Sequence, residues 1–351
     1  MLSTELGQQA RGASWFPDER LIKKTDFLRY SAQNDFDEHA ALLGGIVELT
    51  QLGSGAFDGR MLFARLTNIV LNIDYSNQPF EKEFQNDSHG YNFGLILDQP
   101  AGMQNYGGYA SVPDRMVILP PEGTGLMHSP PGLTLLQFRI KRQAMEERLQ
   151  DAPELADWFS RLRRRPARVV SPWLMQRLRS DCFTALEAAI ACKNEQQRRT
   201  IDQLLIANIV NALNMEYLVQ GALSTGMSSS KLERFRSARK VIHEQWEEFT
   251  STAGGNILDL NELGSKRAVE KSFSACINMG PLSYARIVRL HNARRHLLNE
   301  QYLNQTIGDV AAAFGFFDWS KFSTLYRRHF GERPSETRDR LIKGHRQLLT
   351  A

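Results

Sequence analysis

The sequence has few of the residues that cross-link small secreted proteins, since only three of its 351 residues are cysteines. Cys182, Cys192 and Cys276 are too far apart along the chain for a disulfide framework or a Cys-x-x-Cys zinc motif. No run of about 18 apolar residues occurs, so no segment is expected to span a membrane. The first residues lack the basic-then-apolar layout of a signal peptide. These absences predict a reduced, cytoplasmic protein.

Motifs for metal binding and catalysis are also scarce. A cupin-type metal site needs three or four convergent ligands, usually His with a carboxylate, whereas His39, His89 and His128 stand apart in the sequence. We find no Gly-rich phosphate loop and no Ser/His/Asp order typical of a hydrolase. We therefore expect no enzyme, no metal and no cofactor. The alternative is a cupin-like metal enzyme fused to a basic helical interaction module, which elemental analysis for a bound metal would reveal.

Charge is distributed unevenly between the two parts of the chain. From Lys231 onward there are 20 Lys and Arg against 13 Asp and Glu, a net charge of +7. The preceding 230 residues carry 23 against 26, a net charge of −3. A basic segment of this kind is typical of nucleic-acid-binding domains. It could also face an acidic protein, which would predict no electrophoretic shift of duplex DNA.

The stretch from Thr306 to Phe330 predicts two helices separated by a tight turn. Thr306 and Asp309 have the spacing of a capping box, and apolar residues then recur at i, i+3, i+4 and i+7, namely Ile307, Val310, Ala311 and Phe314. Gly315 is expected to end this helix and Asp318 to cap the next one. The second helix has its own apolar stripe of Phe322, Leu325, Tyr326 and Phe330.

The polar face of the second predicted helix carries the groups that could contact DNA. A helix fits the major groove, where side chains near its N-terminus reach base edges. The candidates for base contacts are Trp319, Ser320, Lys321 and Thr324. In the last turns Arg327 and Arg328 are candidates for phosphate contacts. The alternative is a solvated surface helix of a helical domain.

The run from Ile307 to Arg338 resembles the C-terminal signature of the AraC/XylS transcription regulators. The shared positions are Gly315-Phe316, Phe322, Phe330-Gly331, Pro334-Ser335 and Arg338. Thr337 departs from the signature, which usually has an aromatic residue there, and this predicts looser packing. The resemblance covers about residues 231–340. It implies a sequence-specific regulator, with activator among its expected roles, that binds double-stranded promoter or operator DNA and contacts RNA polymerase.

The resemblance also implies a first helix-turn-helix ahead of Pro281. Ser265 can cap its second helix, whose implied base-reading residues are Arg267, Glu270 and Lys271, with Lys266 beside phosphate. This copy is about two residues shorter than usual between Leu260 and Phe273, so its first helix is expected to be truncated. A long helix from Pro281 to Asn299 would join the two motifs and offer Arg294 to phosphate.

Residues 36–150 predict a β-rich sensor domain. Short runs rich in β-branched and aromatic residues alternate with Pro/Gly turns; the runs are Arg60–Arg65, Asn68–Tyr75, Tyr91–Leu97, Val112–Leu119 and Leu133–Arg139. Their even spacing favours a barrel or sandwich, and a resemblance to ethanolamine-operon-regulator-type members implies a cupin-like one. Candidates for an effector pocket are Tyr91, Phe93, Arg65 and Gln137; the alternative is that the aromatic residues simply fill the core.

The remaining segments complete an α+β chain. Residues 1–35 have few patterned apolar positions and predict an N-terminal arm. Residues 151–220 predict a helical connector or dimerisation segment, because apolar residues from Ile201 to Leu213 repeat at helical spacing. Such a stripe could pair with a second subunit or pack against the β-rich domain. Residues 221–230 are small and polar and predict a linker, followed by the all-α double helix-turn-helix domain at 231–351.

Overall fold

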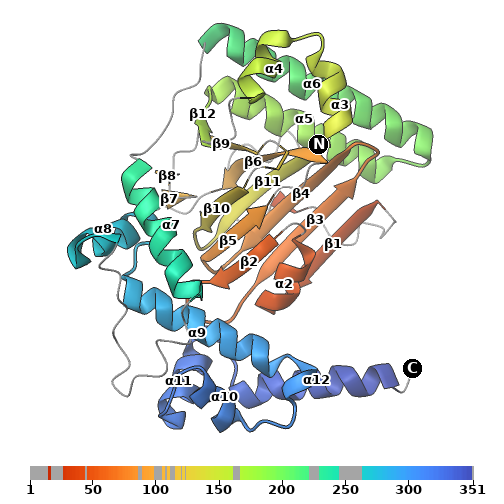
Figure 1. The fold of residues 1–351 in the computed structure, drawn as a ribbon. Coiled ribbons are helices and arrows are strands. Elements are labelled where there is room, and N and C mark those ends of the chain that lie inside the picture. Colours follow the sequence, from red (N-terminus) through yellow and green to blue (C-terminus); the bar gives the residue numbers. More distant parts are fainter. Residues whose placement is uncertain are drawn as a thin grey trace. The chain divides into compact units, whose positions relative to one another are not determined.

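The computed structural model describes residues 15–16, 27–43, 46–85, 89–98, 105–106, 109–110, 115–119, 121–122, 124–160, 167–220, 229–244 and 263–349. They form an α+β protein, which confirms the predicted fold class (Figure 1). The chain divides into two compact units. The first unit contains 1–49, 58–77 and 82–227, and the second contains 50–57, 78–81 and 228–351.

The strands form separate antiparallel sheets, so the described part of the predicted cupin-like domain is open and has no single closed barrel. The seven-stranded sheet has the order β1 (Leu28–Gln33), β3 (Gly59–Arg65), β4 (Ile69–Ser76), β11 (Leu133–Lys141), β6 (Gly90–Asp98), β9 (Arg115–Leu119) and β12 (Ala167–Val169). A three-stranded sheet has the order β10 (Thr124–Ser129), β5 (Phe80–Gln85) and β2 (Ile46–Gln51). The short strands β7 (Asn105–Tyr106) and β8 (Tyr109–Ala110) pair with each other.

The predicted strands coincide with observed ones at β3, β4, β6 and β11, and the described end of the fourth predicted run is β9. The expected N-terminal arm needs a correction, because Leu28–Gln33 is strand β1, paired with β3 along its whole length. Its sequence, LRYSAQ, buries only its two end residues. Hydrogen bonding to a neighbouring strand therefore fixes this segment without a periodic apolar pattern.

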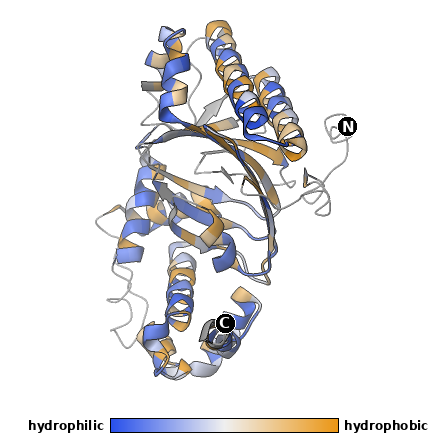
Figure 2. Ribbon diagram, turned by 90° about the vertical axis from the view of Figure 1, so that its right-hand side faces the viewer, coloured by the Kyte–Doolittle hydropathy of each residue, from blue (hydrophilic) through white to orange (hydrophobic). Residues whose placement is uncertain are grey.

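One face of the seven-stranded sheet packs against helices. They are α3 (Arg142–Leu149), α4 (Pro153–Ser160), α5 (Pro172–Ala191) and α6 (Glu195–Gln220). Strands and helices share one continuous hydrophobic core, and Figure 2 shows hydrophobic residues along the strands and on the pair of long helices. On the sheet, Phe93 stacks on its cross-strand partner Phe138 with ring centroids 4.7 Å apart.

Two buried carboxylates of α6 join this helix to the β3–β4 turn and to the start of α5. Asp202 of α6 accepts hydrogen bonds from the backbone N–H groups of Asn68 and Ile69, at 2.6 and 2.9 Å. Glu216 accepts from both the N–H and the hydroxyl of Ser171, the residue that caps α5. Pro172 follows at the first helical position, where its missing N–H costs nothing. Helix α5 therefore begins directly after Ser171.

The second unit is helical apart from residues 50–57 and 78–81. Its elements are α7 (Ser229–Glu244), α8 (Lys266–Ile277), α9 (Pro281–Leu297), the 3-10 turn η5 (Glu300–Tyr302), α10 (Ile307–Ala313), α11 (Trp319–Phe330) and α12 (Pro334–Leu349). Three internal segments between α4 and α8 lie outside the described residues. They are 161–166, residues 221–228 of the predicted linker, and 245–262, which contains the predicted first helix of the first motif. Helix α2 (Phe36–Leu42) belongs to the first unit.

Among the described residues, no helix combines the length and the apolar character that crossing a bilayer requires.

Candidate nucleic-acid interface

Helices α10 and α11 are held by the local signals that the sequence predicts. The Thr306 hydroxyl accepts from the Asp309 N–H at 3.1 Å, and Asp309 accepts from the Thr306 N–H at 2.9 Å, which completes a capping box. The Thr306 hydroxyl also donates to the Asp309 carboxylate at 2.7 Å, and this bond, together with the one from the Thr306 N–H, lowers the pKa of Asp309. Gly315 adopts a φ of 74°, in the left-handed region that glycine tolerates best. Asp318 then caps α11 by accepting from the Lys321 N–H at 3.0 Å, so the two helices form a helix-turn-helix.

The apolar side of α11 is buried against α9 and α10. Phe322 and Tyr326 are fully buried, in a cluster with Leu290, Val310 and Phe314. The other side is exposed, and it carries every base or phosphate candidate of this helix: Trp319, Ser320, Lys321, Thr324, Arg327 and Arg328. Lys321 is 81% exposed, with Nζ 3.1 Å from Asp318 Oδ2. The exposed face therefore presents an indole, two hydroxyls and three cations.

Helix α8 shows the same division of faces. The Ser265 hydroxyl accepts from the Ala268 N–H at 3.3 Å, which makes Ser265 the N-cap that the sequence predicts. Val269, Phe273 and Cys276 are buried. The exposed side carries the candidates Lys266, Arg267, Glu270 and Lys271. Asn278 ends the helix in the left-handed conformation, with a φ of 53°.

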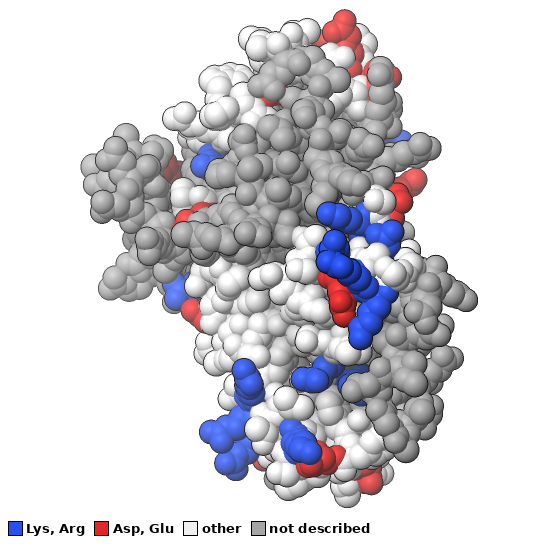
Figure 3. Space-filling view, turned by 90° about the vertical axis from the view of Figure 1, so that its left-hand side faces the viewer, with Lys and Arg blue, Asp and Glu red and all other residues white. Residues whose placement is uncertain are grey.

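Lys and Arg side chains gather in groups on the face of the molecule drawn in Figure 3, with only a few acidic side chains among them. On α8 and α11 the exposed cations named above outnumber the single exposed acid of α8, Glu270. An excess of exposed positive charge of this kind attracts the phosphates of nucleic acid.

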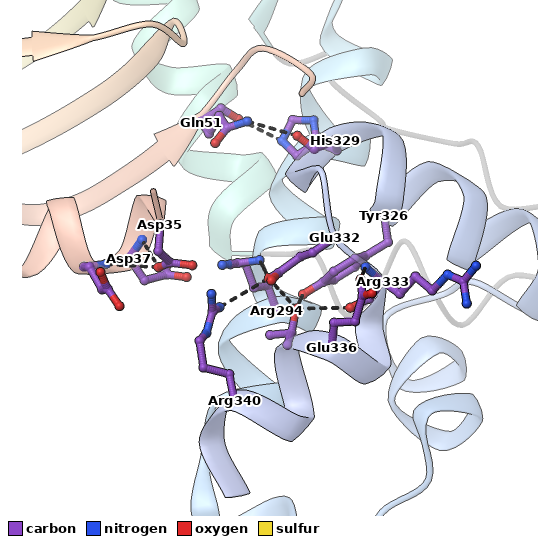
Figure 4. Close-up of polar contacts among 12 residues, drawn as sticks. Asp35, Asp37, Gln51, Arg294, Tyr326, His329, Glu332, Arg333, Glu336 and Arg340 are labelled. Atoms are coloured by element: carbon purple, nitrogen blue, oxygen red, sulfur yellow. Dashed lines mark hydrogen bonds and ion pairs between the residues drawn. The ribbon is translucent and has the colours of Figure 1, made fainter. Parts of the chain in front are cut away.

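One predicted phosphate contact is wrong. Arg294 of α9 is only 2% exposed, and its guanidinium is paired with the carboxylate of Glu332 (Figure 4). It also lies over the ring of Phe330, 4.7 Å from the centroid. Arg340 reaches the same carboxylate at 3.2 Å. The pattern of α9 does not distinguish an inward arginine from an outward one, because the acid that draws Arg294 inward lies 38 residues later.

Thr337 does not leave the end of the domain loosely packed. It is fully buried, and its hydroxyl is 2.8 Å from the Tyr326 hydroxyl and 2.6 Å from Glu332 Oε1. Burial raises the pKa of Tyr326, so this phenol stays neutral and able to donate. A hydrogen-bonded threonine thus takes the place of the aromatic residue expected there, and it joins Tyr326 to the Arg294–Glu332 pair.

Residues from 50–57 and 78–81 complete the core of the second unit. The carbonyl of Gln51 accepts from His329 Nε2 at 3.1 Å, and Gln51 Nε2 donates to the His329 carbonyl at 3.0 Å (Figure 4). The same carbonyl accepts from His291 Nε2 at 3.1 Å. Burial lowers the pKa of His291 well below its usual range and that of His329 to about 4. Both imidazoles are therefore neutral at pH 7.

The buried carboxylate of Glu81 contacts side chains of α7 and α9. Glu81 is 1% exposed and is contacted by the guanidinium of Arg239 and the hydroxyl of Tyr284. His243 Nε2 is 2.7 Å from the same hydroxyl. No sequence signal marks these partners, because Glu81 is separated from Arg239 by 158 residues and from Tyr284 by 203.

Two large apolar residues of the second unit, neither of them a predicted site residue, are exposed. Phe317, in the turn before α11, is 71% exposed, and Leu282, at the start of α9, is 45% exposed. Trp319, one of the base candidates, is 59% exposed. Large apolar groups in such numbers beside cationic side chains are typical of a surface that another molecule covers. The turn pattern alone could have indicated Phe317, because Gly315 ends one helix and Asp318 caps the next.

The four candidates for an effector pocket do not converge. Phe93 is the cross-strand partner of Phe138, and Gln137, one residue earlier, therefore lies on the opposite face of the sheet. Tyr91 and Phe93 contact Phe159 on the helical side, with ring centroids 5.4 and 6.2 Å apart. They pack in the core, as the alternative interpretation held. Gln137 keeps a buried Nε2 that has no partner among the described residues.

The described residues contain no group of three or more His, Cys, Asp or Glu placed to hold a metal ion. The three cysteines are free thiols, and burial raises the pKa of Cys276 to about 12.

Comparison with known proteins agrees with this geometry. Residues 264–340 match the sequence profile of a family described as "Helix-turn-helix domain". The second unit thus carries a DNA-binding helix-turn-helix domain. That domain is of the AraC type, which confirms the resemblance stated from the sequence.

Individual relatives are more distant. Over 119 residues the chain is 29% identical to "Regulatory protein HrpB" of Ralstonia nicotianae, and the match spans 34% of this chain and 24% of that protein. The solved AraC-like transcriptional activator CuxR has a TM-score of 0.40 at 15% identity, covering 82% of this chain and 99% of that one. ToxT from Vibrio cholerae has a TM-score of 0.25 at 9% identity, covering 79% and 98%.

Proposed function

We propose that this protein is a sequence-specific regulator of transcription that places α11 in the major groove of promoter or operator DNA. The observation that carries the proposal is the division of α11 into a buried apolar side and an exposed side of hydroxyls, cations and an indole. Buried Phe322 and Tyr326 fix the rotation of the helix about its axis. The exposed side is therefore held toward a partner, as a recognition helix requires.

The exposed side chains divide by position along the helix. Trp319, Ser320, Lys321 and Thr324 lie in its first two turns, where recognition helices contact base edges. Arg327 and Arg328 lie in the last turn, from which they reach phosphate oxygens. Exposed Phe317 and Trp319 add apolar surface that fits the methyl group of thymine, a major-groove feature that only A·T pairs present.

Helix α8 is proposed as a second contact, with Arg267, Glu270 and Lys271 toward bases and Lys266 toward phosphate. Its capped N-terminus and exposed polar side support this role. Two such helices joined by α9 would enter major-groove segments one helical turn, about 34 Å, apart on one face of the duplex.

Dimerisation of the front half is proposed through a seam on α6. Its exposed positions Leu204, Asn211, Met215 and Leu218, with half-buried Asn208, are spaced 4, 3, 4 and 3 residues apart in the order 204, 208, 211, 215 and 218, which is a heptad pattern. Leu204, Met215 and Leu218 are 61%, 54% and 60% exposed, which is high for large apolar residues. Antiparallel packing about an axis at Asn211 would set Leu204 against Leu218 of the partner subunit.

The regulatory part of the proposal is a small-molecule effector that acts through the first unit. Activation through contact with RNA polymerase in the cytoplasm is the expected outcome, as the AraC-type domain suggests. Segments 50–57 and 78–81 support coupling, because they continue into strands β2 to β5 and yet belong to the helical unit. A ligand that shifted those strands would change the surroundings of His329 and Glu81.

The test is selection of bound fragments from the genome of the source organism, followed by titration of the best fragment and a scrambled duplex of equal length. We expect the selected fragment to bind at least about a thousandfold more tightly at roughly 150 mM salt, which is the lower end of the usual range of specificity ratios. Equal affinity for both duplexes would contradict the proposed function. Absence of any shift would favour a basic interaction module.

A further inference from the structure

A cleft of about 790 Å³ opens at one end of the seven-stranded sheet. It is lined by the turn between β3 and β4, by the residue before β6, by the end of β11 and by one side of α3. Its size lies within the roughly 300–1,000 Å³ range of sites for small molecules. All of these elements belong to the first unit.

Among the charged residues of the lining, cations outnumber acids. Arg65, Arg139, Lys141 and Arg142 line the cleft together with His89, and the acids are Glu146 and Glu147. Arg142 is engaged by Glu146, with Nε 2.7 Å from Oε1. Glu147 accepts from Gln143 at 2.9 Å. Within the described ranges, the side chains of Arg65 and Lys141 have no acidic partner, so the cleft keeps positive charge that a ligand could neutralise.

Strand register brings three of these cations to one face of the sheet. Val70 of β4 is the direct cross-strand partner of Arg65 on β3 and of Arg139 on β11. Residues directly opposite each other project from the same face, so the two arginines flank Val70, about 10 Å apart across two strand spacings. Lys141 lies two residues beyond Arg139 and therefore projects from that face as well.

The residue at position 90 leaves room for Arg139. A Cβ added to Gly90 would lie 2.9 Å from Arg139 Nε and 2.8 Å from the carbonyl of Ile140. The arginine side chain therefore lies directly over the backbone of β6, where a larger residue would displace it. Such close packing restricts the rotamers of a long side chain and prepares it for a ligand.

We propose that this cleft binds a phosphorylated small molecule of about mononucleotide size. The guanidinium groups of Arg65 and Arg139 have the planar fork that matches phosphate oxygens, and Lys141 adds a point charge. Leu66 and Val70 offer apolar surface to the remainder of the ligand. Binding itself is independent of DNA, whereas the assignment of the ligand as effector rests on the proposed regulatory function.

Isothermal titration of the full-length protein without DNA tests the proposal, with ADP and inorganic pyrophosphate as probes and adenosine as the uncharged comparison. Saturable binding of ADP and pyrophosphate, with none of adenosine, is the expected result. Arg65→Ala and Lys141→Ala should each weaken ADP about tenfold or more, because each removes a charge-assisted contact. Arg65→Lys, which keeps the charge and loses the fork, should bind more weakly than the native protein.

Arg148→Ala is the matched control, because Arg148 is an exposed arginine of α3 that does not line the cleft. Its ADP affinity should equal that of the native protein, and thermal melting should show that all four variants are folded. The proposal is overturned if neither phosphate probe binds, or if Arg65→Ala and Lys141→Ala bind ADP as tightly as Arg148→Ala does. Titrating duplex DNA with the same proteins separates this failure from a failure of the DNA-binding proposal.

Discussion

At the scale of single residues, Lys321 and Arg328 stand on the same exposed side of α11 but in different turns. Lys321 follows the cap at Asp318 closely and is 81% exposed, whereas Arg328 lies in the last turn. Charge alone makes them equivalent. Position along a recognition helix gives one of them access to base edges and the other access to phosphates.

Replacing Lys321 by alanine should change which sequences are bound. We expect a loss of about 1–3 kcal/mol of discrimination at one or two base pairs, because an ammonium donor to a base acceptor is removed. Titrating the selected site and its single-base variants with native and Lys321→Ala protein measures the effect. If the variant loses affinity for specific and random duplex equally, Lys321 does not read bases.

Arg328→Ala should weaken all duplexes to a similar degree. Loss of one phosphate contact should make the slope of log K against log salt shallower by roughly one unit. Arg199→Ala, which removes an exposed arginine of α6 in the first unit, should leave the slope unchanged. A sequence-dependent loss with an unaltered slope would show that Arg328 contacts bases instead.

Arg294 is expected to act through stability. Arg294→Ala leaves Glu332 in a half-buried site with one of its two arginine partners and removes the contact with Phe330. Breaking a pair of this kind costs about 3 kcal/mol or more, so the melting temperature should fall while the salt slope of DNA binding stays the same. A shallower slope in a protein of native stability would restore the phosphate role predicted from sequence.

At the scale of elements, the seam of α6 gives the clearest expectation. Leu218→Glu would place a charge in the proposed antiparallel interface and should convert a dimer into a monomer, as seen by sedimentation equilibrium. Gln196→Glu introduces the same charge at an exposed position two turns before the seam, and the mass of the dimer should stay unchanged. A native protein that is already monomeric at micromolar concentration would contradict the interface.

Elements with local signals were predictable, and those fixed by distant partners were not. The capping box at Thr306, the cap at Asp318 and Gly315 lie within the segment that they shape, so their pattern is readable from sequence. The pairing of strand β1 and the burial of Arg294 depend on partners 26 or more residues away. Alternating aromatic residues on β6 also predict two faces without telling which one the helices cover.

The placement of the candidate site follows the same rule. All six exposed candidates on α11 were found because amphipathic periodicity defines a free face once the apolar face is known. The cationic cleft was only partly visible, through Arg65, since it depends on the register of β3, β4 and β11. Register is set by the pairing between strands, so the sequence of a single strand does not determine it.

At the scale of the whole molecule, stability should depend on pH through two buried histidines. The pKa of His329 is about 4 in the folded protein against 6.5 for an unperturbed imidazole, and that of His291 is also lowered. A lowered pKa means that the unfolded chain binds more protons between these values. Stability should therefore be full above pH 6.5 and fall by about 3 kcal/mol for His329 alone as pH approaches 4.

Urea unfolding of the full-length protein at about pH 7.0 and about pH 5.0 measures this loss of stability. His329→Gln keeps a donor for the Gln51 carbonyl without a titrating ring, so its stability should vary less between the two pH values. Equal pH dependence in native and variant proteins would show that the buried imidazole is not the group responsible.

The account depends on the exposed side of α11 lying in the major groove, and chemical protection of the bound site tests this most directly. Dimethyl sulfate methylates guanine N7 in the major groove and adenine N3 in the minor groove. In the complex with the native protein, we expect guanine N7 atoms to be protected in two patches about one helical turn apart. In the complex with a Ser320→Ala/Lys321→Ala double variant, which still binds through phosphates, the guanines contacted by α11 should become reactive again. A saturated complex with every guanine N7 reactive, or with protection confined to adenine N3, would contradict it.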